Sequence, residues 1–207
     1  KKMKKMGALR KKLMYTHKNG ITLRKMERDD LKNLKALKDE SWFGTHNIAI
    51  INMDEQKKWY ESMISNGKGM VLIAAESERQ EIPIGVYKIS NLDWINGRYD
   101  SAHDVFQGAR GKGFGKTILE AGVDFGFEVL NAHRIDTEVL ENNVASKKCA
   151  LFVGFQEEGV KRKCVHKCDQ WLDSVFYGLL REDWRELERV ERMDGVCNKS
   201  YQPKDGN

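Results

Sequence analysis

Long hydrophobic runs are missing from this sequence of 207 residues. Its main apolar run, Val71–Ala75, is far shorter than the roughly 20 residues that a membrane-spanning helix needs. No apolar segment follows the basic N-terminus, so we expect neither a secretory signal nor a membrane association. With 40% hydrophobic and 32% charged residues, the composition predicts a soluble domain large enough for a real core.

Proline and cysteine are also scarce. Two prolines provide no Pro-rich linker, and no internal repeat divides the chain, so we predict one domain. The four cysteines do not form a disulfide framework, which favours a reducing cytoplasm. Cys164, His166 and Cys168 alternate, and a strand would place all three on one side. A structural zinc site needs four ligands and a different spacing, so we expect no metal.

The positive charge is concentrated at one end. Residues 1–20 hold eight Lys or Arg and no acid, and the remaining 28 basic residues face 31 acidic ones. We therefore divide the chain into a basic arm (1–20), a domain (21–184) and a charged C-terminal tail (185–207). Such an arm could contact nucleic acid or a membrane surface, although a solvated end is the simpler interpretation.

Alternating and helical patterns predict an α+β domain around one mixed sheet. Four helices are expected: from Asp29 or Asp30 through Leu37, from Asp54 to Asn66, from the end of the glycine-rich stretch to Leu130, and from Val144 to Val153. Asn96-Gly97 indicates a hairpin turn, and Gly154 ends the last helix. The strands are predicted, in order, at residues 21–25, 71–75, 84–92, 98–106, 135–140, 155–165 and 171–180.

The stretch Arg110–Thr117 carries the strongest chemical signal. Three glycines alternate there and allow positive-φ backbone, and a helical pattern begins immediately afterwards. A glycine-rich turn that opens a helix presents free N–H groups and a positive dipole end, which favour phosphate oxygens. The surrounding charge comes from Arg110, Lys112 and Lys116. The spacing does not fit the Walker pattern, and the mid-chain position does not fit a dinucleotide fingerprint.

Two motifs at a defined separation carry a family resemblance. Arg110-x-x-Gly113-x-Gly115, followed by Glu141–Ser146 and then Gly154-Phe155, resembles the GNAT superfamily of acetyl-CoA-dependent N-acetyltransferases. Residues 154–184 resemble the branch that contains ribosomal-protein, spermidine and amino-sugar-nucleotide acetyltransferases. The resemblance extends from about residue 20 to residue 184. It implies a single domain whose mostly antiparallel sheet splays apart between its fourth and fifth strands, with flanking helices.

The resemblance also implies where acetyl-CoA binds. The loop amides would hold the pyrophosphate, the backbone of the fourth strand would pair with the pantetheine amides, and the helix after Asn143 would contact the arm from the other side. The implied residues are Val105, Phe106, Arg110, Gly111, Lys112, Gly113, Phe114, Gly115, Lys116, Thr117, Asn143 and Ser146. Asn143 can alternatively, or additionally, cap that helix.

Transfer to an amine requires a base, because an amine with a pKa of about 10.4 is protonated at neutral pH. The family pattern favours Glu138, with His103, Asp104 and Asp100 as competitors. A backbone N–H near Val105 would stabilise the oxyanion. Ala150 stands where many family members have a tyrosine acid, which leaves Ser146 as a weak substitute. We expect direct transfer in a ternary complex and reject an acyl intermediate on Cys149, because a buried helical cysteine is usually a packing residue.

The acceptor is the least defined part of the expectation. Trp42 and Phe43 are predicted to wall its site. We favour an amino-sugar nucleotide, from the branch and from the Trp94–Asn96 hairpin. A ribosomal-protein N-terminus is the first alternative, and a polyamine or aminoglycoside follows. A different class remains open: a non-catalytic CoA-binding module whose basic arm binds nucleic acid. A homodimer is considered as the assembly.

Overall fold

The computed structural model describes residues 14–41, 44–46 and 52–187. They form one sheet of eight strands in the order β1-β2-β3-β4-β5-β6-β8-β7. Neighbouring strands are antiparallel except for the parallel pair β5 and β6. The strands are β1 Met14–Thr16, β2 Ile21–Lys25, β3 Met70–Glu76, β4 Pro83–Asp93, β5 Arg98–Val105, β6 Arg134–Leu140, β7 Gln156–Lys167 and β8 Gln170–Leu180.

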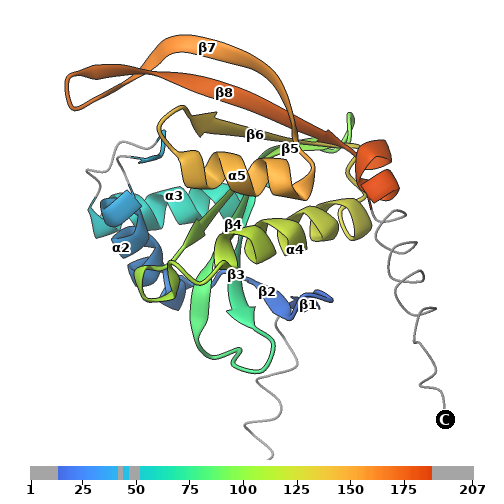
Figure 1. Cartoon of the computed structure of the whole chain (residues 1–207). Helices are drawn as coiled ribbons and strands as arrows, with labels where there is room; N and C mark the ends of the chain where they lie inside the picture. The colour runs from blue at the N-terminus through green and yellow to red at the C-terminus, as the bar shows by residue number, and fades with distance from the viewer. Residues whose placement is uncertain (1–13, 42–43, 47–51, 188–207) are drawn as a thin grey trace, which may run out of the picture.

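Helices cover both faces of this sheet (Figure 1). On one face, α2 and α3 pack on a small core that includes Leu34, Tyr60 and Val86. On the other, α4 and α5 pack on the main core. The helical elements are η1 Arg28–Asp30, α2 Leu31–Ser41, α3 Met53–Asn66, η3 Gln107–Ala109, α4 Phe114–Glu128 and α5 Val144–Val153. The predicted α+β architecture is thus confirmed.

The approach of α4 to the sheet depends on glycine. A Cβ on Gly122 would collide with the ring of Tyr87, and one on Gly126 would collide with the hydroxyl of Tyr99. Both tyrosines are completely buried, and their hydroxyls are 3.0 Å apart. Burial raises the pKa of both phenols. The two glycines therefore allow a hydrogen-bonded pair of buried tyrosines to fit beneath the helix.

The splay predicted between the fourth and fifth strands is present between β5 and β6. These strands pair only at their beginnings, from Arg98 with Arg134 to Asp100 with Asp136. Beyond that point the bonds between them involve side chains: Thr137 Oγ1 donates to the carbonyl of Ser101. The strands then separate and leave a fork in the sheet, which agrees with the splay that the resemblance implies.

Two further segments attach to the domain at its ends. The strand β1 pairs with β2, so the end of the predicted basic arm lies against the sheet. Residues 181–187 are helical after β8, and Trp184 is buried there. Residues 1–13 and 188–207 lie outside the described part of the chain. Among the described residues, no helix has the length and apolar character needed to cross a membrane.

Candidate active site

A cleft of about 690 Å³ opens at the fork. It is lined by the end of α2, the end of β5, the glycine-rich loop, and the first turns of α4 and α5. These segments are far apart in the sequence, but they contain most of the predicted cofactor-binding residues. The fork therefore brings the two family motifs to a single cavity.

The glycine-rich loop has the backbone geometry expected of a phosphate-binding turn. Gly111 and Gly113 have φ angles of 77° and 83°, in the left-handed region, and Gly113 is the N-cap of α4. The first amides of a helix have no helical acceptor. An added Cβ would meet nothing within 4 Å at either glycine, so conformation and not space requires glycine there.

The basic side chains of the loop make different contacts. Arg110 Nε donates to the carbonyl of Val105 (3.1 Å), and its Nη2 lies 3.4 Å from Glu40. Lys112 Nζ donates to the carbonyl of Gly108 (3.3 Å). Lys116 Nζ lies 4.2 Å from the centroid of the exposed Phe152 ring. Arg110 thus braces the loop against β5, while the two lysines lie at its surface.

The backbone of β5 offers hydrogen-bonding groups to the fork. Phe106 N–H donates to the carbonyl of Ile84 on β4 (2.9 Å), so that amide is already used. Because neighbouring residues of a strand direct their backbone groups to opposite sides, those of Val105 face the fork. The contact of Arg110 with the Val105 carbonyl agrees with this direction. Val105 N–H is therefore available to a ligand.

The opposite wall is formed by the start of α5. Asn143 Oδ1 accepts from Ser146 N–H (3.1 Å), which makes Asn143 the N-cap of α5. Its Nδ2 donates to the carbonyl of Gly44 (2.9 Å), so both ends of the amide are used within the protein. Beside it, Thr45 Oγ1 is buried and has no hydrogen-bond partner among the described residues. Thr45 and Ser146 line the cleft and provide hydroxyl groups for a bound molecule.

The proposed bases lie on opposite faces of the sheet. His103 pairs with Tyr87, which packs on α4 at Gly122, so His103 faces α4. Ile135 on β6 also faces α4. Glu138 is three residues further along and points to the other face, toward α2 and α3. An acceptor approaching from one face can therefore reach only one of these two groups directly.

Glu138 has a partner that sequence reasoning missed. His46 Nε2 lies 3.4 Å from Glu138 Oε1 and 2.7 Å from the hydroxyl of buried Ser174. Lys161 Nζ is 3.9 Å from the same carboxylate oxygen. Burial lowers the pKa of His46, the charge of Glu138 raises it, and Lys161 and Lys167 lower it; the net direction is downward. A neutral imidazole therefore lies beside the carboxylate.

On the α4 face, His103 and Cys149 approach the first turn of α4. A Cβ on Gly115 would lie 3.3 Å from Cys149 Sγ and 3.8 Å from His103 Nε2. Burial lowers the pKa of His103, the charge of Asp104 raises it and the charge of Lys88 lowers it, and the net direction is downward. Burial raises the pKa of the Cys149 thiol, and Lys116 lowers it to a lesser degree. Near neutral pH the imidazole is uncharged and the thiol keeps its proton.

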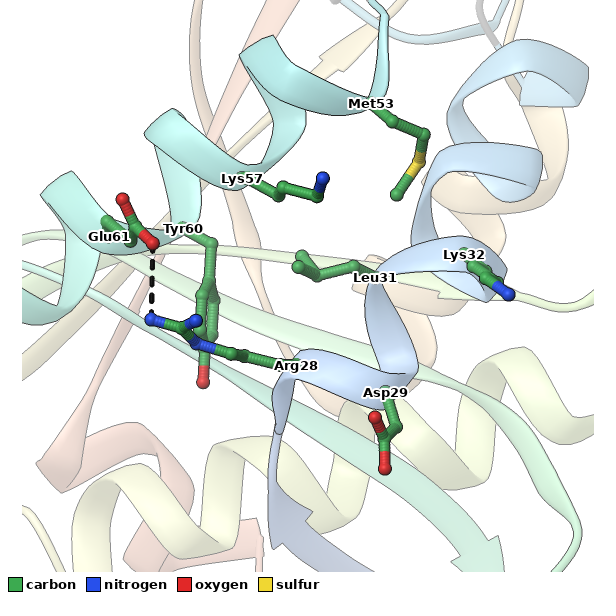
Figure 2. A pocket seen from close by; sticks show the side chains of 8 residues that line it. All are labelled: Arg28, Asp29, Leu31, Lys32, Met53, Lys57, Tyr60 and Glu61. Atoms are coloured by element: carbon green, nitrogen blue, oxygen red, sulfur yellow. Dashed lines mark hydrogen bonds and ion pairs between the residues drawn. The ribbon is translucent and has the colours of Figure 1, made fainter.

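Other candidate features lie elsewhere. Trp42 and Phe43 are outside the described residues. Within the described ranges no group of three or more His, Cys, Asp or Glu side chains is arranged to hold a metal ion. A hollow of about 390 Å³ between η1, α2 and α3 is walled by Leu31, Met53 and Tyr60 (Figure 2). It contains none of the predicted site residues.

Comparison with known proteins agrees with this geometry. Residues 21–156 match the family model described as an acetyltransferase (GNAT) domain. The chain belongs to the GNAT acetyltransferase family. This GNAT protein is 28% identical over 176 residues to the uncharacterized N-acetyltransferase p20 of Bacillus licheniformis, which covers 83% of this chain and 97% of that protein. It is 24% identical over 144 residues to the spermidine N(1)-acetyltransferase of Vibrio cholerae, covering 67% of this chain and 80% of that one.

The fold is also that of a solved GNAT structure. The crystal structure of a spermidine N-acetyltransferase from Vibrio cholerae in complex with CoA and spermine has a TM-score of 0.75 at 21% identity, and covers 80% of this chain and 98% of that one. The GNAT protein described here is thus an acetyl-CoA-dependent acyltransferase. The amino-sugar nucleotide that we favoured as acceptor finds no support in these comparisons. Association of copies of the chain stays a prediction.

Proposed function

We propose that this enzyme acetylates a primary amine of a small polycation, of the spermidine class, by direct transfer within a ternary complex. Acetyl-CoA supplies the activated acetyl group. Residues of the chain hold it in the fork, accept the proton of the amine and attract the acceptor. The choice of acceptor rests on a group of carboxylates that lie with Glu138 on one face of β5 and β6.

These carboxylates come from both arms of the fork. Asp100 and Asp104 on β5, and Asp136 and Glu138 on β6, point to the face of α2 and α3. Lys88 neutralises Asp104 and Arg134 neutralises Asp136. Asp100 accepts a hydrogen bond from the neutral amide of Asn91 (2.6 Å), and among the described residues no cation pairs with it. A negative charge therefore remains at the base of the fork.

The spacing of these groups suits an acceptor with several amines. Asp136 and Glu138 are two residues apart on one strand, which places their Cα atoms about 6.6 Å apart. Ammonium groups separated by a few methylene groups can match this distance. One amine can lie near Glu138 while the next lies toward Asp100, which is the strand partner of Asp136 and has no cationic partner among the described residues. A spermidine N-acetyltransferase is among the relatives, which agrees with this class of acceptor.

Glu138 is the base in this proposal, and Val105 N–H is the group for the developing oxyanion. Glu138 lies on the face of the acidic groups, whereas His103 lies on the α4 face with the glycine-rich loop. The proton that the thiolate leaving group takes up is assigned to solvent or to Ser146, because Ala150 stands where many family members have a tyrosine acid. Phosphate groups fit the amides and lysines at the start of α4.

The decisive experiment is acetyl transfer to a matched panel of acceptors. Spermidine is compared with a monoamine of the same chain length, a peptide with a free N-terminus and an amino-sugar nucleotide. We expect kcat/KM for spermidine to exceed that for the monoamine by at least about tenfold, because each of its two further ammonium groups can form an ion pair, and one ion pair at about 4 Å contributes on the order of 1 kcal/mol even in water. Higher turnover of the peptide or the sugar would overturn the assignment.

Two variants connect that preference to the acidic face. Asp100→Asn should raise KM for spermidine about fivefold and leave KM for the monoamine unchanged, since one interaction near 1 kcal/mol is removed. Glu157→Gln removes an exposed carboxylate of β7 and serves as the matched control. Added salt should weaken the preference, because exposed charges are screened over about 10 Å at 0.1 M ionic strength.

A further inference from the structure

The connection between α2 and α3 places a histidine beside Glu138, the proposed base. His46 comes from the short segment 44–46, and its Nε2 atom contacts two oxygens: Ser174 Oγ at 2.7 Å and Glu138 Oε1 at 3.4 Å. Ser174 is 128 residues away in the sequence and fully buried in β8. The side chain of His46 is 35% exposed, so the ring joins a buried hydroxyl and the carboxylate to solvent.

The segment that carries His46 is fixed to the cofactor cleft. The Gly44 carbonyl accepts from Asn143 Nδ2 at the start of α5 (2.9 Å). Asn143 in turn caps α5 through Ser146 N–H. A single residue, Thr45, therefore separates an anchor on the cleft wall from the residue whose ring touches Glu138. A displacement of α5 or of the connection would change the distance between His46 and the base.

The hydrogen bonds of Nε2 define two states of the ring. When the proton is on Nδ1, the hydroxyl of Ser174 can donate to Nε2, whose lone pair is free. When Nε2 carries a proton, it can donate to Ser174 Oγ or to Glu138 Oε1, because a serine hydroxyl both donates and accepts. Ser174 therefore holds the ring in either state, and Glu138 interacts with Nε2 only when a proton lies between them.

We propose that His46 is the positioning and proton-relay residue for Glu138, a role that rests on the proposed acetyl transfer to an amine. The amine N–H bond breaks as Glu138 Oε1 takes the proton. That O–H bond then breaks as Nε2 of neutral His46 takes the same proton. The imidazolium releases its Nδ1 proton to water, which restores the carboxylate and leaves a neutral ring protonated on Nε2. Exchange with solvent then removes the Nε2 proton and reprotonates Nδ1, which frees Nε2 for the next turnover. The charged groups that face the ring are Glu138 on β6 and Lys161 and Lys167 on β7.

The test uses the full chain and three variants in steady-state acetylation of spermidine. His46→Ala removes the ring, and His46→Gln keeps a hydrogen-bonding side chain that cannot titrate. His133→Gln is the matched control, because His133 is an exposed histidine at the opposite end of β6. We expect His46→Ala and His46→Gln to lower kcat by about tenfold, below the roughly 10²-fold that a direct acid–base group contributes. KM for acetyl-CoA should stay unchanged.

The pH profile and chemical rescue separate a relay from a merely structural residue. In the wild type, kcat should fall at acid pH as His46 becomes protonated and can no longer accept a proton. The variants should lose that part of the acid limb, and added imidazole should restore part of the rate of His46→Ala. A loss of kcat by the same factor at every pH, without rescue, would overturn the relay.

The proposed function can fail separately from the relay. If the wild type acetylates spermidine and Glu138→Gln lowers kcat while both His46 variants match the wild type, the relay is wrong and the function holds. If the wild type transfers acetyl groups to none of the amines, the proposed function is wrong and the relay with it.

Discussion

His17 Nε2 lies 2.5 Å from Asp124 Oδ2, and both residues are about 5% exposed. Asn19 N–H donates to His17 Nδ1, so the ring proton is on Nε2 and is donated to the carboxylate. Trp184 Nε1 donates to Asp124 Oδ1 (2.7 Å). One buried carboxylate therefore joins the turn after β1, the helix α4 and the helical segment that follows β8.

Replacement of this carboxylate should destabilise the fold. In Asp124→Asn the amide has one acceptor and one donor, whereas His17 and Trp184 both donate, so one donor loses its partner. A buried unsatisfied group costs about 1–3 kcal/mol. Urea unfolding should show that loss in the free energy of unfolding. Glu128→Gln, which alters an exposed bond to Tyr15, is the control and should change stability by less than about 0.5 kcal/mol.

The same pair predicts a pH dependence of stability. Burial lowers the pKa of His17, but its hydrogen bond to Asp124 and the charges of Asp124 and Glu120 raise it above 6.5. A group whose pKa is higher in the folded state stabilises the protein fully at pH values below its unfolded-state pKa. This stabilisation is lost as the pH rises through the folded-state pKa. The stability difference between wild type and Asp124→Asn should therefore shrink above pH 6.5. A difference that is constant from pH 5.5 to 8.5 would contradict this assignment.

The sequence could reveal the glycine-rich loop because its signal is local, whereas the fork was predicted only through the family resemblance. Gly113 stands immediately before α4, and its positive φ follows from the turn that starts that helix. His46 gave no comparable signal. It lies in an aperiodic connection, and its partner Ser174 is 128 residues away. Contacts of this kind depend on how distant strands are brought together, which periodicity and spacing do not encode.

The segments at the two ends of the domain show the same limit of prediction from sequence patterns. The segment Met14–Thr16 lies in a stretch dominated by lysine and arginine, which we interpreted as a basic arm. It pairs with β2 in a local hairpin, but the burial of His17 beside Asp124 depends on α4, more than a hundred residues away. Trp184 is likewise buried by contacts with Phe127 and Asp124. Charge composition alone cannot predict such attachments.

Substitution in the loop should weaken acetyl-CoA binding without unfolding the protein. Gly113→Ala forces a side chain into φ 83°, which costs about 1–2 kcal/mol for a non-glycine residue. Relaxation of the turn would move the first amides of α4 and raise Kd for acetyl-CoA by roughly tenfold. Calorimetric titration checks this. Gly108→Ala is the control, because Gly108 has neither a positive φ nor a neighbour within 4 Å of an added Cβ.

Cys149 should be dispensable for the chemistry. Its thiol is half-buried, and burial raises its pKa, so little of the nucleophilic thiolate is present near neutral pH. We expect Cys149→Ala to retain kcat within about twofold and to give intersecting initial-rate lines, as direct transfer requires. Parallel lines in the wild type, together with inactivity of Cys149→Ala, would instead indicate an acyl-enzyme.

Glu138→Gln should reduce turnover most strongly at low pH. A primary amine with a pKa of about 10.4 is almost entirely protonated near pH 7, and exposing its lone pair costs about 4 kcal/mol. A base within the site lowers this cost, whereas at alkaline pH the solvent removes the proton unaided. The ratio of wild-type to variant kcat for spermidine should therefore be about 10²-fold near pH 7 and should fall as pH rises.

The binding of acetyl-CoA provides the internal check on that result. Glu138 points away from the α4 face, so its replacement should leave Kd for acetyl-CoA within about twofold, since surface substitutions of this kind typically change free energies by less than 0.5 kcal/mol. Glu157→Gln, which changes an exposed carboxylate of β7, should match the wild type in both measurements. If the wild-type to variant ratio is the same at all pH values, Glu138 is not the base, and Asp104, on the same face as Glu138, becomes the next residue to replace.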